Sequence, residues 1–231
     1  MDDGRAGGRA RIAYFCPGSL REGTALHAHV MGIAEGLRAR GWSVEVFAPR
    51  HDWRPGRAAL ARAAAILATQ ARLMAGGRPD LVYTRWHFAS FPAALWARSR
   101  GIPFVVEVNG PYEDLLAAWP RARWLSWALR PAMRRQLLWA EAVVAVTSGL
   151  SEYVRAEAGR AAWVVANGAD TALFRPDAPP LPGLPPAYAV FFGELAPWHD
   201  LPTMIAAVRE PAWPAGVGLV IVGGGAQQGR V

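Results

Sequence analysis

Short apolar runs alternate with longer amphipathic stretches along most of the chain. The runs are rich in valine, isoleucine and phenylalanine, and the stretches between them repeat apolar residues with helical spacing. The runs predict strands at residues 11–15, 43–48, 80–84, 103–108, 142–147 and 163–165. The stretches predict helices at residues 30–40, 57–75, 88–100 and 121–140, the last with a break near Pro131, and a further helix from Ser148.

The composition of these strands indicates how they are packed. A strand with one face in water alternates apolar and polar residues, whereas a strand buried on both faces is almost continuously apolar. The strands here are of the second kind and alternate with helices, which is the pattern of a parallel sheet covered by helices on both faces. The sequence therefore predicts an α/β fold, with a doubly wound, Rossmann-like domain over residues 1–166.

The pattern stops after this domain and then begins again. Residues 167–187 are rich in proline and glycine and carry no periodicity, as expected of an interdomain linker. Residues 188–231 then predict a strand, a helix and a second strand. Because two strands and one helix cannot bury their own apolar faces, we interpret this last segment as the incomplete start of a second Rossmann-like domain.

The charge of the chain favours an anionic partner. Its 25 basic residues are all arginine and outnumber 18 acidic residues, which gives a net charge of +7. Residues 18–25 resemble a phosphate loop, but the lysine that such a loop needs is absent from the chain. We therefore expect no nucleoside triphosphatase, and we do not expect nucleic acid as a partner.

Metal and cofactor sites are also not expected. Cys16 is the only cysteine, which excludes an internal disulfide and a cysteine-based zinc site. His27 and His29 lie two positions apart on a predicted helix, where side chains face different sides and cannot share one ion. The first residues lack the apolar core of a signal peptide, and no uncharged apolar run is long enough to cross a membrane, so a cytoplasmic location is expected.

Candidate binding residues follow the predicted strands, because open parallel sheets bind ligands outside the carboxyl ends of their strands. Arg85 and His87 follow the third strand, where His87 is either functional or an ordinary loop histidine. Asn109 and Gly110 follow the fourth; Asn109 is suited to a hydroxyl-rich ligand, although Asn-Gly also forms plain turns. The loop at residues 18–23 offers backbone N–H groups to an anion, or is a simple tight turn.

Residues 119–139 combine five arginines with four tryptophans. This composition is typical of a helix that lies on an anionic membrane surface. It also suits an ordinary helix that packs its tryptophans into the core. The candidate contacts to lipid phosphates are Arg121, Arg123, Arg130, Arg134 and Arg135.

Four segments share their spacings with one protein family. They are GTALHAHVMGIAEGLRARGWSVEVFAP (23–49), AEAVVAVTSGL (140–150), WVVANGADTALFRP (163–176), and FFGELAPWHDLPTMIAA with LVIVGGGA (191–226). On these segments the chain resembles the retaining glycosyltransferases of family 4. The most specific match is the third segment, which resembles the hinge between the two domains of that family.

The resemblance implies a GT-B architecture, in which the first Rossmann-like domain holds the acceptor and the second binds a nucleoside-diphosphate sugar without a required metal. It implies transfer of a hexose to a glycan or lipid-linked acceptor, in cell-envelope or exopolysaccharide biosynthesis. Residues implied to line the cleft are Gly23, Thr24, Arg85, His87, Asn109 and Gly110, with Arg85 and His87 as the catalytic candidates. Those implied on the donor side are Gly193, Glu194 and His199.

The family's pair of glutamates that holds the donor has no counterpart after Gly225. We therefore expect these 231 residues alone to show no transferase turnover. The alternative is a non-catalytic module that binds a glycan or lipid, or a partner subunit of a separately encoded donor-binding half. The arginine and tryptophan composition of residues 119–139 adds peripheral attachment at the inner face of the membrane to the expected location.

Overall fold

The computed structural model describes residues 10–50, 59–179, 181–196, 199–225 and 227–230. They form two compact units. The first contains the described residues up to Arg21 together with His29–Gly168, and the second contains Glu22–Ala28 and the described residues from Ala169 onward. Each unit is described by itself.

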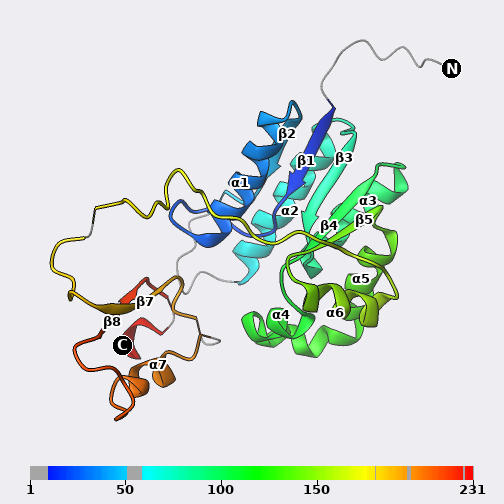
Figure 1. The fold of residues 1–231 in the computed structure, drawn as a ribbon. Helices are drawn as coiled ribbons and strands as arrows, with labels where there is room; N and C mark the ends of the chain where they lie inside the picture. Colours follow the sequence, from blue (N-terminus) through cyan, green and yellow to red (C-terminus); the bar gives the residue numbers. More distant parts are fainter. Residues whose placement is uncertain (1–9, 51–58, 180, 197–198, 226, 231) are drawn as a thin grey trace. The chain divides into compact units, whose positions relative to one another are not determined.

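The first unit is built on a six-stranded sheet in which every pair of neighbours is parallel (Figure 1). The strands are β1 (Arg11–Phe15), β2 (Ser43–Phe47), β3 (Leu81–Arg85), β4 (Phe104–Val108), β5 (Ala142–Ala145) and β6 (Trp163–Val164). Their order is β2-β1-β3-β4-β5-β6, so β2 lies on one side of β1 and β3 lies on the other. The predicted α/β class and parallel sheet are confirmed.

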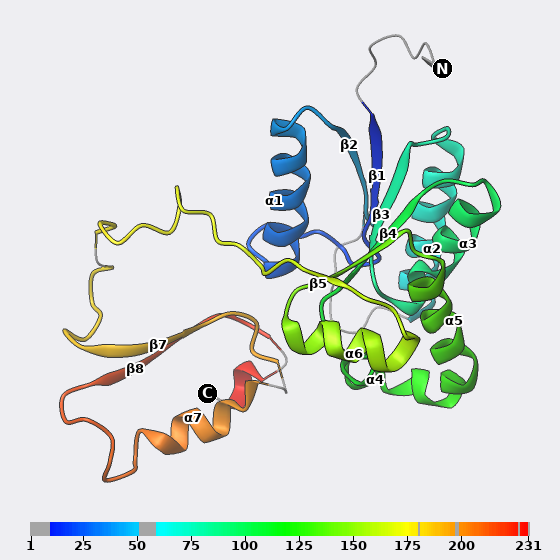
Figure 2. The ribbon, with the colours of Figure 1, turned by 45° about the vertical axis from the view of Figure 1, so that its right-hand side comes forward.

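Helices cover both faces of this sheet. They are α1 (Ala25–Ala39), α2 (Ala59–Ala75), the 3₁₀ turn η1 (Phe88–Ser90), α3 (Phe91–Ser99), α4 (Tyr112–Ala118), the 3₁₀ turn η2 (Pro120–Leu125), α5 (Ser126–Trp139) and α6 (Ser148–Ala158). Figure 2 shows α1 on one side of the sheet and α2, α3 and α5 on the other. The sequence prediction did not include α4.

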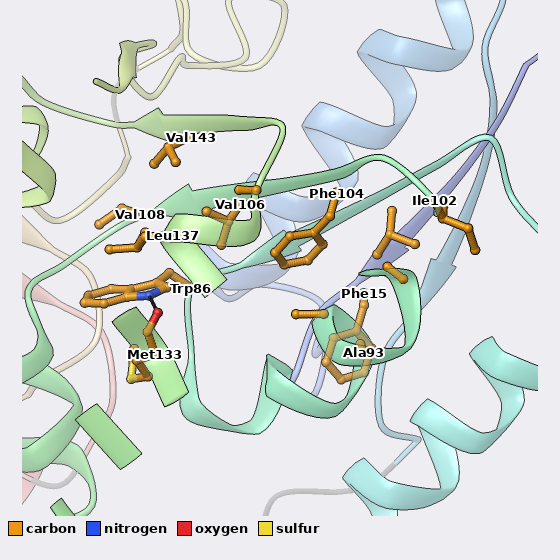
Figure 3. Packing of buried hydrophobic residues seen from close by; sticks show 14 of the residues in the cluster. Phe15, Trp86, Ala93, Ile102, Phe104, Val106, Val108, Met133, Leu137 and Val143 are labelled. Atoms are coloured by element: carbon orange, nitrogen blue, oxygen red, sulfur yellow. Dashed lines mark hydrogen bonds between the residues drawn. The ribbon is translucent and has the colours of Figure 1, made fainter. Parts of the chain in front are cut away.

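The main hydrophobic core lies on the face covered by α2, α3, α5 and α6 (Figure 3). Phe15, Phe104 and Val106 of the strands pack there against residues of these helices. Trp86, directly after β3, joins the same core and donates its indole N–H to the carbonyl of Met133 over 3.0 Å. A buried indole therefore has its polar atom satisfied, and this bond ties the end of β3 to α5.

The predicted helix break near Pro131 is wrong. Helix α5 begins at Ser126, so Pro131 lies in its second turn and the helix continues through it to Trp139. Proline removes the hydrogen bond to the carbonyl four residues earlier, which belongs to Trp127. Trp127 is exposed, so water can bind that carbonyl, and the buried residues of α5 on its opposite side hold the helix together.

The second unit contains a parallel pair of strands, β7 (Tyr188–Phe192) and β8 (Gly218–Val222), with helix α7 (Leu201–Ala207) between them in the chain. A short 3₁₀ turn, η4 (Gln228–Arg230), follows. Apolar side chains of β7, α7 and β8, with Trp213, line an open hollow on this unit. The strand, helix and strand predicted from the sequence are all present here.

Candidate functional site

The carboxyl ends of β1, β3 and β4 lie next to one another at one edge of the first unit's sheet. The chain turns from β1 into α1 on one face and from β3 into η1 and α3 on the other. A parallel sheet binds its ligands at such a switch point, outside the carboxyl ends of the strands. This edge is therefore the candidate site.

A buried carboxylate forms the centre of the edge. Glu107 of β4 is only 1% exposed and accepts three hydrogen bonds. The Tyr83 hydroxyl donates to Oε2, and the amide of Asn109 donates to Oε1. His29 Nε2 lies 2.6 Å from Oε1, and it carries the proton because a carboxylate only accepts. One residue of α1, one of β3 and one beyond β4 are thus held by one side chain.

These donors keep Glu107 ionised. Burial by itself would raise its pKa, because a charged group loses its hydration in the interior. Hydrogen bonds from His29, Tyr83 and Asn109 outweigh the burial and hold the pKa of Glu107 below its ordinary value of 4.5. The edge therefore contains a fixed negative charge at neutral pH, and its hydrogen-bond donors are fixed with it.

Arg85 lies beside Glu107 but is not its partner. The two residues are paired in the register of β3 and β4, so their side chains leave the same face of the sheet. Within the described part of the chain, the Arg85 guanidinium makes no hydrogen bond or ion pair, and Glu107 accepts from His29, Tyr83 and Asn109 instead. Arg85 is therefore a cation that remains able to bind an anionic or hydroxyl-rich ligand.

Two further polar groups at the end of β1 are not suited to acid–base work. The Tyr14 hydroxyl is buried and has no hydrogen-bond partner among the described residues, and its ring meets that of Tyr83 edge-on at 4.8 Å. Burial raises the pKa of Tyr14. Burial likewise raises the pKa of the Cys16 thiol to about 11, so this thiol is protonated and is not a nucleophile at neutral pH.

His87 serves as a cap for η1. Its Nδ1 accepts the N–H of Ala89 over 3.0 Å, which places the ring proton on Nε2. Its carbonyl accepts from Gln136 over 3.0 Å, and its ring packs against Phe88 and Trp119. Burial, with a contribution from the charge of Arg85, lowers the pKa of His87 to about 4. The imidazole is therefore neutral near pH 7, and its Nε2–H is a hydrogen-bond donor.

The remaining residues predicted on the acceptor side have local roles. Thr24 accepts the N–H of His27 at the start of α1, and Gly23 before it has a φ of +78°, a left-handed conformation that favours glycine. Asn109 is bound to Glu107. A Cβ at Gly110 would lie 2.9 Å from Oδ2 of Asp114, so a larger residue at this position would displace the end of that side chain.

The residues predicted on the donor side follow β7 in the second unit. The N–H of Gly193 donates to the carbonyl of Val222 over 2.9 Å and extends the pairing of β7 with β8. His199 Nδ1 lies 2.6 Å from the carbonyl of Glu194, and the His199 ring meets that of Phe191. The imidazole is thus held by Glu194 and Phe191.

Sequence reasoning missed the centre of the edge. Glu107 carries a charge inside the apolar run PFVVEV, which is a signal in itself, because a carboxylate in a strand buried on both faces needs partners. His29, which the sequence excludes as a metal ligand beside His27, has Glu107 as its partner. Tyr83, which lies 24 positions before Glu107, had no signal at all.

The part of the chain that the structure describes contains neither a metal-binding cluster nor a membrane-spanning helix. No group of three or more histidine, cysteine, aspartate or glutamate side chains is arranged to hold a metal ion. Among the same residues, no helix has the length and apolar character needed to cross a membrane.

Comparison with known proteins identifies relatives at the level of the family and the fold. A family model described as Glycosyltransferase Family 4 matches residues 26–173. Among curated proteins, none matches the chain.

Solved structures of similar fold share little sequence with this chain. A sucrose-phosphate synthase from Thermosynechococcus elongatus superposes with a TM-score of 0.69 at 14% identity, over 92% of this chain and 62% of that one. The Anabaena protein HepE, solved in complex with UDP and glucose, superposes with a TM-score of 0.60 at 17% identity. The match covers 94% of this chain and 62% of HepE. The lipopolysaccharide outer core galactosyltransferase WaaB superposes with a TM-score of 0.54 at 14% identity. The match covers 95% of this chain and 62% of WaaB. This chain therefore spans less than two thirds of each, and at these identities the likeness establishes the GT-B type of fold.

Proposed function

The chain belongs to glycosyltransferase family 4, and on that premise we propose that the protein at its native length transfers a hexose from a nucleoside-diphosphate sugar to a glycan or lipid-linked acceptor, with retention at the anomeric carbon. The first unit would hold the acceptor and the second would contribute to the donor site. No metal or resident cofactor takes part in this proposal. The setting that we propose is cell-envelope or exopolysaccharide biosynthesis.

One observation carries the proposal for the acceptor side. At the carboxyl edge of the sheet, the ionised Glu107 fixes Asn109 and leaves Arg85 without a partner among the described residues. The Asn109 amide nitrogen is engaged, so its carbonyl oxygen remains to accept a hydrogen bond from an acceptor hydroxyl. Arg85 offers a fork of N–H donors, which suits a phosphate or a vicinal pair of hydroxyls.

The same geometry limits what His87 does in the reaction. Because the pKa of His87 is about 4 and its Nδ1 caps η1, His87 has no proton to give near pH 7 except as a hydrogen-bond donor. We assign it a positioning role through Nε2–H, and we assign Arg85 the direct contact with substrate. Substrate contacts of Gly23, Thr24 and Gly110 remain part of the proposal through their backbone N–H groups.

The donor side rests on the second unit and on the family. Gly193 and Glu194 follow β7 directly, the Gly193 N–H is bonded to the carbonyl of Val222, and His199 Nδ1 lies 2.6 Å from the carbonyl of Glu194. The imidazole of His199 would donate a hydrogen bond to the departing diphosphate, where electrostatic stabilisation contributes most. HepE was solved with UDP and glucose, so UDP-glucose is the first donor to test.

The test is a transfer assay with the protein purified from its own source at its native length. Radiolabelled UDP-glucose, UDP-galactose, UDP-N-acetylglucosamine and GDP-mannose are each incubated with membrane lipid extract or soluble oligosaccharide, and label in the product is counted. Transfer from one donor supports the proposal. Binding of lipid extract without transfer from any donor would instead favour the non-catalytic module or the partner subunit, and would overturn the transferase proposal.

Arg85→Gln is expected to raise the KM for the acceptor about tenfold, the effect of one charge-assisted hydrogen bond to a substrate, while the KM for the donor stays within twofold. Arg100→Gln is the matched control, because Arg100 is exposed at the end of α3 and belongs to the opposite edge of the sheet. Initial rates at varied acceptor and donor give the two constants. An unchanged acceptor KM in Arg85→Gln would remove Arg85 from the acceptor site.

The acceptor class also bears on location. A lipid-linked acceptor lies in a membrane, so we propose that the protein is cytoplasmic and attaches peripherally to the inner face. An anionic membrane surface would then be its third partner, beside donor and acceptor.

A further inference from the structure

The segment from η2 into the first turn of α5 exposes large apolar side chains. Trp124 is 85% exposed, Trp127 is 79% exposed and Leu125 is 55% exposed. Each tryptophan has a large apolar surface, which a protein in water normally buries or uses to bind a partner. The three residues, with Arg121 and Arg123 just before them in the chain, are called the Trp124 patch below.

The Trp124 patch is exposed although its backbone is well anchored. Tyr112 Oη and Ser126 Oγ are 2.9 Å apart and share a hydrogen bond, and the N–H of Ala122 donates to the carbonyl of Trp119 over 2.8 Å. Trp119 itself packs against Phe88. The inner side of the segment is therefore fixed to the first unit, and the outward tryptophans are not the product of a loose end.

Spacing places the basic and aromatic side chains together. Residues three apart are eclipsed in a 3₁₀ helix, so Arg121 and Trp124 lie on one side of η2, and Trp127 follows in the first turn of α5. Arg123 directly precedes Trp124 in the same 3₁₀ turn. The patch is thus apolar and basic at once.

The structure divides the five arginines of this region into two groups. Arg130 forms an ion pair with Glu157 at 2.8 Å, and Arg134 donates to the carbonyl of Glu157 over 2.8 Å. In the part of the chain that is described, Arg121, Arg123 and Arg135 are exposed and their guanidinium groups make no hydrogen bond or ion pair. No acidic residue occurs in residues 119–139. The positive charge at the patch is therefore not neutralised by the segment's own residues.

We propose that the Trp124 patch binds the protein to an anionic phospholipid bilayer. Trp124, Leu125 and Trp127 enter the boundary between headgroups and acyl chains, and Arg121 and Arg123 lie among the lipid phosphates. A tryptophan ring with its N–H toward the headgroups suits this depth, and anionic lipid complements the uncompensated charge. The proposal rests on the proposed function for a lipid-linked acceptor, and it names the surface that would reach that acceptor's membrane. Of the five arginines expected from the sequence to contact lipid phosphates, it retains two.

Vesicle sedimentation tests the proposal without any sugar. The full chain is spun down with vesicles of phosphatidylcholine alone or of phosphatidylcholine and phosphatidylglycerol in a 7:3 ratio. We expect wild-type protein to partition onto the anionic vesicles at least tenfold more strongly than onto the neutral ones, with a clear loss at high salt. Equal partitioning onto both, or onto neither, would overturn the proposal.

Four variants locate the surface. Trp124→Ser with Trp127→Ser, and Arg121→Gln with Arg123→Gln, are each expected to lower partitioning onto anionic vesicles about tenfold. Trp163→Ser is the matched aromatic control, because Trp163 is 74% exposed on β6. Arg130→Gln is the matched basic control, because Arg130 already forms an ion pair with Glu157. Both controls are expected to stay within twofold of wild type, and a control that falls as far as the patch variants would contradict the assignment.

The result separates this inference from the proposed function. Protein that transfers sugar but does not bind anionic vesicles refutes the Trp124 patch and leaves the transferase intact. Protein that binds vesicles through the patch but transfers no sugar refutes the transferase and leaves the membrane surface intact.

Discussion

Replacing Glu107 with alanine is expected to lower the free energy of unfolding of the first unit by about 3–5 kcal/mol, the usual cost of removing one side chain from a buried, hydrogen-bonded network that contains a charge. Glu107 is buried and accepts from His29, Tyr83 and Asn109. Alanine removes the acceptor and leaves three donors in the interior without a partner. For a protein of this size the loss corresponds to a fall in Tm of about 10 °C. Urea and thermal unfolding followed by circular dichroism measure both quantities.

Two variants separate the network from the mere volume of the side chain. Glu107→Gln keeps the shape and one acceptor oxygen, so its cost should be about half that of alanine. Tyr83→Phe removes one donor and leaves Glu107 with His29 and Asn109, so we expect a loss of about 1 kcal/mol. If Glu107→Ala lowers the free energy of unfolding no more than Tyr83→Phe does, the carboxylate does not hold this edge of the sheet together.

The sequence predicted the strands well because each is a short apolar run with a clear end. Predicted and observed bounds of β1 agree, and those of β4 differ by one residue. Helix α4 was missed because its seven residues follow Asn109, Gly110 and Pro111, which read as a turn. The alternation of elements also fixed the candidate edge, because parallel strands bring their carboxyl ends together regardless of loop details.

The partners of individual side chains were beyond the sequence. His29 and Glu107 are 78 positions apart, and their contact depends on the packing of α1 over the sheet. The five arginines of residues 119–139 are alike in sequence, yet Glu157 on α6 engages Arg130 and Arg134. Local spacing predicts which face of an element a residue is on, but not which residue of a distant element will meet it.

The stability of the protein is expected to depend on His87 between pH 6.5 and pH 4. Burial, then the charge of Arg85, lowers the pKa of His87 to about 4, whereas an unfolded histidine titrates near 6.5. Between these values the unfolded chain binds the proton and the folded chain does not, so acid favours unfolding. The contribution of His87 is complete above pH 6.5 and is lost as the pH falls to 4, by about 3 kcal/mol in total.

His87→Asn isolates this effect, because asparagine can still accept the N–H of Ala89 and cap η1 but does not titrate. Urea unfolding at pH 7, 5.5 and 4.5 measures the free energy of unfolding, which should change less with pH in the variant than in wild type. His29 is unchanged in the variant, and the pKa of Glu107 lies below 4.5, so the difference in slope belongs to His87. Parallel slopes for the two proteins would mean that His87 is solvated and free to ionise in the folded chain, and would return it to the candidates for proton transfer.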